Sequence, residues 1–224
     1  MGLLIFDCDG VLVDSEAIAE SVLHEQLAAW LPDLAAEHEL SGALGMTTAA
    51  ILSHLEGLSV HQLPPDALLS IDAAIERRLA GELKAIAGIS EAIDDLDLPL
   101  AIVSNSRRAR VLASLSHTGL NTRLGAAPLF TAEQVARPKP APDVYLLAAE
   151  TLATAPADCL VVEDSVSGTR AACAAGMTVI GFTGASHIAA GHAARLRDAG
   201  AWATLEHMAG LGELVERWRR WRVA

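Results

Sequence analysis

Two aspartates at the end of a short apolar run are the residues best suited to chemistry in this sequence. Asp7 and Asp9 follow the apolar residues 3–6 and precede Gly10. Side chains alternate along an extended segment, so both carboxylates can face one site while Cys8 points away from it. One carboxylate can then attack as a nucleophile while the other transfers protons. Gly10 lets the chain turn sharply beside the reacting groups.

The same aspartates have two plainer interpretations. An Asp-x-Asp-Gly sequence recurs by chance, so the acids could be solvated side chains at a strand end. A calcium loop fits less well, because it has glycine at its sixth position and glutamate at its twelfth. Gly10 comes too early for such a loop. The choice between these alternatives depends on the rest of the chain.

Three further polar groups lie at or near the ends of apolar runs. They are Ser104 and Asn105 after residues 100–103, Lys139 before an expected helix, and Glu163 and Asp164 after residues 159–162. Parallel strands deliver their carboxyl ends to one edge of a sheet, so we expect these side chains to meet Asp7 there. Each group alone is common in surface loops and helix caps. Their joint occurrence favours a phosphoryl-transfer site.

Phosphoryl transfer to a carboxylate needs positive charge, because the nucleophile and the phosphate repel each other. A magnesium ion between Asp7 and Asp164 would offset this repulsion. Ser104 and the amides after it could hold phosphate oxygens at a helix N-terminus. Lys139 would supply a fixed charge from a loop that prolines flank on both sides.

A parallel sheet is needed to bring these side chains together, and the apolar pattern predicts one. After residue 88, strand-like runs alternate with helical segments, which implies a parallel sheet covered on both faces. The expected strands are residues 3–6, 100–103, 126–131, 159–162, 178–182 and 201–204. The predicted fold class is therefore α/β, with a Rossmann-like doubly wound core formed by residues 1–15 and 87–224.

Residues 16–86 follow a different pattern. Apolar residues recur there at helical spacing, as in Ile71, Ile75 and Leu79, and prolines and glycines separate the helical stretches. An all-helical stretch that follows the first strand, before the chain returns to the sheet, predicts an inserted cap domain. The alternative is that these helices are an ordinary part of one α/β core.

Composition and charge limit the classes of function. The chain has 224 residues, of which 52% are hydrophobic, enough for a sizeable core. Its net charge of -12 argues against a broad nucleic-acid surface, and no apolar run approaches the length of a membrane span. The three cysteines form no C-x-x-C pair, which suits a reduced compartment. We expect a cytoplasmic protein without nucleic-acid or membrane partners, as a monomer or a weak homodimer.

The polar motifs, taken in order, resemble those of the haloacid dehalogenase superfamily of hydrolases. The resemblance is to the helical-cap branch that includes β-phosphoglucomutase and many small-metabolite phosphatases, and its motifs occupy residues 7–16, 104–106, 137–143 and 163–168. It implies that Asp7 becomes an aspartyl phosphate and that Asp9 is the general acid and base. It also implies a phosphate site and a Mg²⁺ site. The phosphate ligands would be Ser104, Asn105 and Lys139, and the metal ligands Asp7, Glu163, Asp164 and the backbone carbonyl of Asp9.

Single positions distinguish the activities within this superfamily. Dehalogenases lack an aspartate at the position of Asp9, whereas mutases keep it. Mutases also place a basic residue in a cap loop and a histidine soon after the first motif, but residues 45–48 and 17–19 contain neither. We therefore expect a Mg²⁺-dependent phosphatase that acts on a small phosphorylated metabolite, such as a sugar phosphate. A phosphosugar mutase and a catalytically silent binding protein remain the alternatives.

The expected cap would close over the substrate and shape its site. Residues 16–86 contain eleven acids but only three basic residues, which favours a substrate with a single phosphate group. The candidate substrate contacts are Gly45, Met46 and Thr47 in the cap and Arg107 after the second motif. The sequence motifs assign no role to His187 or His192.

Overall fold

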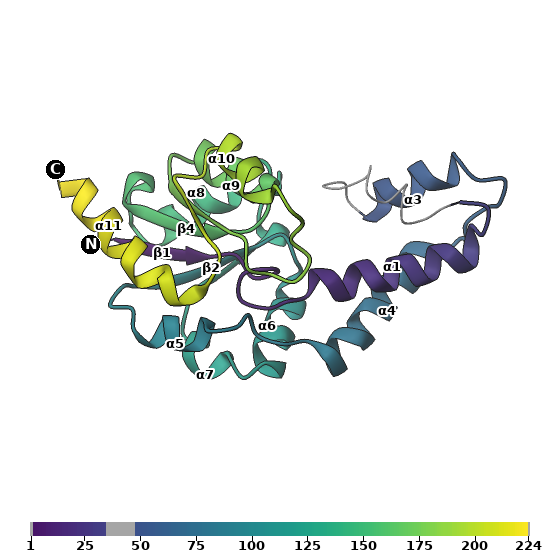
Figure 1. Ribbon diagram of the computed structural model, residues 1–224, viewed down its shortest axis with the longest axis horizontal. Helices are drawn as coiled ribbons and strands as arrows, with labels where there is room; N and C mark the ends of the chain where they lie inside the picture. Colours follow the sequence, from purple (N-terminus) through teal and green to yellow (C-terminus); the bar gives the residue numbers. More distant parts are fainter. Residues whose placement is uncertain (1, 35–47, 224) are drawn as a thin grey trace. The chain divides into compact units, whose positions relative to one another are not determined.

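The computed structural model describes residues 2–34 and 48–223 (Figure 1). The chain forms two compact units, a core unit of residues 1–14 and 83–224 and a helical unit of residues 15–82. Residues 83–86, expected in the cap, belong to the core unit because backbone bonds tie them to the loop after the first strand. Asp14 N donates to the Lys84 carbonyl at 2.9 Å, and Ile86 N donates to the Leu12 carbonyl at 3.0 Å.

A parallel sheet of six strands runs through the core unit in the order β3-β2-β1-β4-β5-β6. The strands are β1 (Leu3–Phe6), β2 (Leu100–Ser104), β3 (Leu129–Thr131), β4 (Cys159–Glu163), β5 (Thr178–Phe182) and β6 (Ala203–Leu205). Strand β1 lies between β2 and β4, and its four residues are buried. A central parallel strand is covered on both faces, which explains its uninterrupted apolar sequence. The α/β fold expected from the sequence is confirmed.

Helices cover both faces of this sheet. On one face, Ile5 and Val161 pack with Tyr145 and Ala171, which lie on α8 (Asp143–Thr151) and α9 (Val166–Ala174). Helix α10 (His192–Asp198) lies on the same side in Figure 1. The opposite side carries α5 (Ile89–Asp94), α6 (Arg108–His117) and α7 (Asn121–Leu124). The connections also contain the short 3-10 helices η1 (Ala132–Gln134), η2 (Pro156–Asp158) and η3 (Met208–Gly210).

The core unit ends in α11 (Leu211–Val223). Its apolar face is formed by Leu211, Val215 and Trp218, all of which are buried. Four arginines and the exposed Trp221 occupy the other positions between residues 217 and 222, and Arg222 pairs with Asp158. Cations near a helix C-terminus interact favourably with the helix dipole, so the arginine-rich end is accounted for as a helix terminus.

The helical unit contains α1 (Glu16–Trp30), α3 (Thr48–Glu56) and α4 (Ala67–Glu82). Helices α1 and α4 run side by side (Figure 1). An ion pair of 2.8 Å joins Glu25 on α1 to Arg78 on α4. Ile71, Ile75 and Leu79 of α4 are buried, as their helical spacing predicts, whereas Leu68 at the start of this helix is 39% exposed. Among the described residues, no helix has the length and apolar character needed to span a membrane.

Candidate active site

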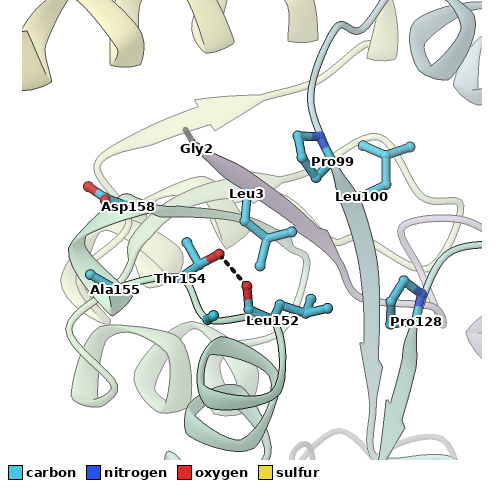
Figure 2. Close-up of a pocket in the computed structure, with 10 residues that line it drawn as sticks. Gly2, Leu3, Pro99, Leu100, Pro128, Leu152, Thr154, Ala155 and Asp158 are labelled. Carbon is cyan, nitrogen blue, oxygen red and sulfur yellow. Dashed lines mark hydrogen bonds between the residues drawn. The ribbon is translucent and has the colours of Figure 1, made fainter.

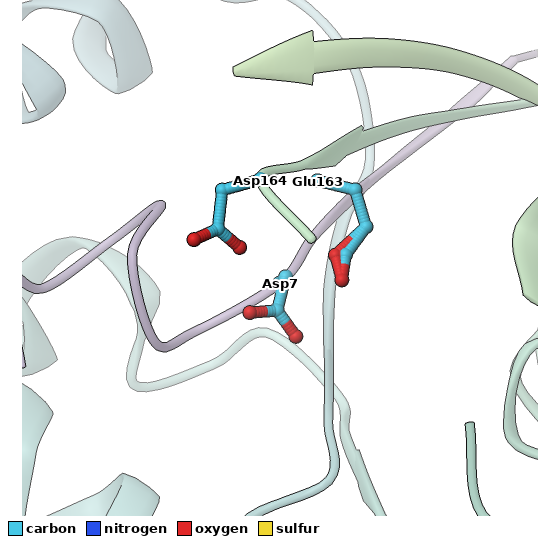
Figure 3. Close-up of side chains that lie close together, drawn as sticks. All are labelled: Asp7, Glu163 and Asp164. Carbon is cyan, nitrogen blue, oxygen red and sulfur yellow. The ribbon is translucent and has the colours of Figure 1, made fainter. Parts of the chain in front are cut away.

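Three carboxylates converge at the carboxyl ends of β1 and β4 (Figure 3). Asp7 follows β1, and its N–H donates to the Val162 carbonyl at 3.0 Å, which fixes the point where the chain leaves the sheet. Glu163 is the last residue of β4 and Asp164 follows it. One oxygen from each carboxylate lies within 4.8 Å of the others, and all three residues are buried. The sequence-predicted metal ligands Asp7, Glu163 and Asp164 therefore form one cluster.

The ammonium group of Lys139 lies in this carboxylate cluster. Lys139 Nζ is 2.5 Å from Asp7 Oδ1 and 3.4 Å from Glu163 Oε1, and it also donates to the Val103 carbonyl at 3.2 Å. Only 3% of the Lys139 side chain is exposed. A buried lysine is tolerated when its charge is paired and its protons have acceptors, and both conditions hold here.

Asn105 ties the loop that carries Lys139 to the end of β2. Its side-chain amide donates to the Lys139 carbonyl at 3.2 Å, and its side-chain carbonyl accepts from Lys139 N at 3.0 Å. The hydroxyl of Ser104 accepts from Ser106 N at 2.9 Å, so the chain turns back over the strand end. Both polar groups of the Asn105 side chain bond the Lys139 backbone. The main-chain N–H of Asn105 is therefore the group with which this residue could bind a phosphate.

Asp9 lies in the turn after β1 and is only half-buried. Ser106 Oγ donates to Asp9 Oδ2 at 2.6 Å, so the third residue of the second motif holds this carboxylate. Gly10 in the same turn has a φ of 77°, and a Cβ there would lie 2.0 Å from Asp164 Oδ2. Glycine is therefore required both by the left-handed backbone and by the close approach of a candidate metal ligand.

Burial governs the electrostatics of the cluster. It raises the pKa of Asp7 from 3.8 to about 8, and the charge of Glu163 raises it further while Lys139 opposes the rise. It likewise raises the pKa of Glu163 from 4.5 to about 7. For Lys139, burial disfavours the charged form, but Asp7 and Glu163 outweigh it and raise the pKa well above its usual value. The lysine therefore stays charged, and the carboxylates need more positive charge to be fully ionised at neutral pH.

Glu163 occupies a tight cradle at the start of α9. Its Oε1 accepts from Ser165 Oγ at 3.0 Å, and Ser165 Oγ in turn accepts from Gly168 N at 2.9 Å as the N-cap of the helix. A Cβ at residue 168 would lie 1.6 Å from Glu163 Oε1. Glu163 Oε2 is buried and has no hydrogen-bond partner among the described residues. An ionised oxygen in that position calls for a cation.

The sequence model of the haloacid dehalogenase-like hydrolase family matches residues 4–182. The chain belongs to this family. CbbY of Rhodobacter capsulatus is 33% identical over 190 residues, which cover 79% of this chain and 83% of that protein. Hexitol phosphatase A of Escherichia coli is 34% identical over 180 residues, which cover 79% of this chain and 80% of that protein.

A solved structure extends the likeness over nearly the whole chain. A conserved haloacid dehalogenase-like protein of unknown function from Agrobacterium tumefaciens is 38% identical, with a TM-score of 0.88 over 97% of this chain and 98% of that one. Together with the family match, these relatives identify the chain as a phosphoric monoester hydrolase of the phosphoglucomutase-like branch. The family assignment made from the four sequence motifs is confirmed.

Of the substrate contacts expected for this haloacid dehalogenase-like hydrolase, Arg107 alone lies among the described residues. Gly45, Met46 and Thr47 lie outside the described residues. Arg107 lies directly before α6 with its side chain exposed, in the segment that follows Ser106. It is therefore close along the chain to the residue that holds Asp9.

Two histidines without a role in the sequence motifs contact Asp164. His187 Nε2 is 3.2 Å from Asp164 Oδ2, and His192 Nε2 is 2.5 Å from the Asp164 carbonyl oxygen. Burial lowers the pKa of His192 below its usual value. The sequence could have indicated that these histidines lie near the site, because residues 183–191 follow the carboxyl end of β5. That end lies at the same edge of the sheet as the carboxylates.

A separate hollow of about 460 Å³ lies at the opposite edge of the sheet (Figure 2). Its lining includes residues at or just before the first positions of strands, such as Leu3, Leu100, Pro128 and Asp158, together with residues 152–155 after α8. In an α/β fold the ligand site forms at the carboxyl ends of the strands, so this hollow is not part of the carboxylate site.

Proposed function

We propose that this hydrolase is a Mg²⁺-dependent phosphatase that cleaves a small phosphorylated metabolite through an aspartyl phosphate on Asp7. The observation that carries the proposal is the buried pairing of Lys139 Nζ with Asp7 Oδ1 at 2.5 Å inside a cluster of three carboxylates. This arrangement supplies a nucleophile, a fixed cation and an all-oxygen ligand set at one point. These are the parts that phosphoryl transfer to a carboxylate requires.

The residues present fit a magnesium ion. Asp7, Glu163 and Asp164 offer only hard carboxylate oxygens, which suit Mg²⁺ better than softer metals. The buried Glu163 Oε2 has no hydrogen-bond partner in the described part of the chain, as expected for a group that a cation would satisfy. The backbone carbonyl of Asp9 completes the proposed ligand set. When bound, the metal supplies the positive charge that keeps Asp7 ionised and offsets its repulsion from the phosphate.

In the first step, a carboxylate oxygen of Asp7 attacks phosphorus and the bond to the leaving oxygen breaks. Lys139 holds the Asp7 carboxylate through Oδ1. The proton that the leaving alkoxide needs comes from Asp9, whose carboxyl Ser106 holds at 2.6 Å. Ser104 and the main-chain N–H of Asn105 bind the phosphate oxygens at the end of β2.

In the second step, a water molecule attacks the phosphorus of the aspartyl phosphate. Asp9, now ionised, takes a proton from that water, and the bond between phosphorus and the Asp7 oxygen breaks. The products are inorganic phosphate and the Asp7 carboxylate. One side chain thus serves as acid and then as base, so Asp9 must stay in place through both steps.

The substrate class follows from charge and from the relatives. The helical unit, proposed to act as the cap, is strongly acidic, which disfavours a second anionic group on the substrate. One relative at 34% identity is named a hexitol phosphatase. We therefore assign a monophosphate of a sugar or sugar alcohol as the substrate class.

The test measures inorganic phosphate released from a panel of sugar and sugar-alcohol monophosphates, with Mg²⁺ and with a chelator. We expect Mg²⁺-dependent turnover that Asp7→Asn abolishes, because an amide cannot form the aspartyl phosphate. Asp95→Asn, at an exposed residue after α5, is the matched control and should leave turnover unchanged. Interconversion of isomeric sugar phosphates without phosphate release would identify a mutase instead. No turnover of any member would support a silent binding protein.

A further inference from the structure

His187 and His192 reach Asp164 from outside the motifs of the proposed mechanism. His187 lies in residues 183–191, which connect β5 to α10, and its Nε2 is 3.2 Å from Asp164 Oδ2. His192 is the first residue of α10, and its Nε2 is 2.5 Å from the Asp164 carbonyl oxygen. The two rings therefore contact the side chain and the main chain of one residue.

The chemistry of the acceptors fixes the direction of both contacts. A carbonyl oxygen and an ionised carboxylate can only accept, so each histidine must donate from Nε2–H. The neutral imidazole that carries its proton on Nε2 is sufficient for this. His187 Nδ1 is buried and has no hydrogen-bond partner among the described residues, so Nε2 is the nitrogen through which the ring contacts Asp164.

The loop that carries His187 is itself anchored to the first motif. Ser186 donates to Asp14 Oδ1 from its main-chain N–H at 3.1 Å and from its hydroxyl at 2.9 Å. Asp14 N in turn donates to the Lys84 carbonyl. Because Ser186 and His187 are adjacent, Asp14 fixes the position from which the imidazole approaches Asp164.

The Asp164 carboxylate is consequently confined on two sides. The backbone of Gly10 leaves no room for a Cβ beside Oδ2, and His187 Cε1 would lie 3.1 Å from such an atom. With His192 holding the main-chain carbonyl, neither rotation of the side chain nor a shift of the backbone is easy. Only 5% of the Asp164 side chain is exposed.

We propose that His187 and His192 are positioning residues that hold Asp164 in the orientation in which it meets Asp7, and so set the affinity of the metal site. The inference rests on the proposed function, because it assumes that Asp164 is a metal ligand. Hydrogen bonds to a ligating group orient it before the metal arrives, and losing such a partner costs about 10- to 100-fold in metal affinity or activity. The same magnitude is expected for loss of the His187 ring.

The experiment measures the Kd for Mg²⁺ of the intact protein by isothermal titration calorimetry, without substrate. His187→Ala should weaken Mg²⁺ binding by about tenfold or more. His187→Gln, which can place an amide N–H near the same carboxylate oxygen, should restore most of the affinity. His192→Ala should weaken binding in the same direction. His207→Ala, at an exposed histidine before η3, is the matched control and should bind as the wild type does.

Asp164→Asn distinguishes loss of the positioning role from loss of the proposed metal site. If the wild type binds Mg²⁺ and Asp164→Asn does not, the site exists, and equal Kd values for His187→Ala and His207→Ala then overturn only the positioning role. If the wild type binds no divalent metal, the proposed function itself fails. Thermal unfolding without metal checks folding of each variant. Should His187→Ala not fold, the comparison of His187→Gln with His187→Asn, whose shorter amide does not reach as far, decides the question by the same Kd difference.

Discussion

Lys139 Nζ and Asp7 Oδ1 are 2.5 Å apart and buried, although the two residues are separated by 132 positions in the sequence. Glu163 Oε1 lies 3.4 Å from the same ammonium nitrogen. One lysine therefore compensates two buried carboxylates whose pKa values burial raises. Stability and chemistry of the site depend on the same charge.

Removal of that charge should destabilise the metal-free protein strongly. Lys139→Met leaves two buried carboxylates without a counter-charge, and breaking a buried pair in this way costs about 3–5 kcal/mol. We expect a drop of about that size in the free energy of unfolding by urea, and loss of phosphatase activity. Lys84→Met, at an exposed lysine of the core unit, is the control and should be nearly neutral. An unfolding midpoint unchanged by Lys139→Met would show that the pair does not exist in solution.

The hydrogen bond from Ser106 to Asp9 predicts a kinetic effect. Ser106→Ala removes a bond of 2.6 Å to the group that transfers the proton. We expect kcat to fall about tenfold with a smaller change in KM, since one hydrogen bond to a charged group is worth about 1.5 kcal/mol. Steady-state kinetics on the best substrate measure this. Ser116→Ala, on the exposed side of α6, should leave kcat unchanged, and an equal kcat for both variants would contradict the role of Ser106.

The cradle around Glu163 predicts a steric effect. A methyl group at residue 168 would lie 1.6 Å from Glu163 Oε1, so Gly168→Ala must displace the carboxylate or the start of α9. We expect a loss of about 1–3 kcal/mol in unfolding free energy, the usual cost of overpacking, together with weaker Mg²⁺ binding. Gly212→Ala, on α11 with open space around it, should be neutral or stabilising. Unchanged Mg²⁺ affinity in Gly168→Ala would exclude Glu163 from the metal site.

The raised carboxylate pKa values predict how stability and metal binding vary with pH. Folding raises the pKa of Asp7 from 3.8 to about 8 and that of Glu163 from 4.5 to about 7, so the metal-free folded state binds more protons than the unfolded state. Stability of the metal-free protein should therefore fall as pH rises from about 4 towards 8. Urea unfolding with a chelator at several pH values measures this, and Asp7→Asn should show a shallower fall.

Magnesium binding should show the complementary dependence. A cation that ionises Asp7 and Glu163 displaces their protons, so affinity should rise between pH 6 and 8, with protons released on binding. Calorimetric titration in two buffers of different ionisation enthalpy detects that release. A binding heat that is the same in both buffers would mean that the carboxylates are already ionised without metal.

Much of the fold could be predicted because buried parallel strands have a clear sequence pattern. The bounds of β1, β2 and β4 lie within one residue of the ranges that their apolar runs predict. The polar residue after each run predicts which edge of the sheet carries the site. Strand β3 was expected over residues 126–131 but covers only Leu129–Thr131, since a short strand next to a loop has no periodicity to mark its start. The point at which the chain returns to the core unit is set by the backbone hydrogen bond between Ile86 and Leu12, which no local pattern in the sequence marks.

The amino-acid sequence by itself determined which groups can do chemistry: Asp7, Asp9, Lys139, Glu163 and Asp164 each stand at or near an element end that a local pattern marks. Only the tertiary structure decided how these groups are held. Three sets of contacts join segments far apart in the chain. They are the hydrogen bonds of Asn105 to the Lys139 backbone, the hydrogen bond from Ser106 to Asp9, and the contacts of His187 and His192 with Asp164. Such contacts depend on packing of the strands and helices, so no local pattern encodes them. Lys139 illustrates both contributions. Its flanking prolines are visible in the sequence, whereas its hydrogen-bond partners come from three different strands or strand ends, which only the tertiary structure brings together.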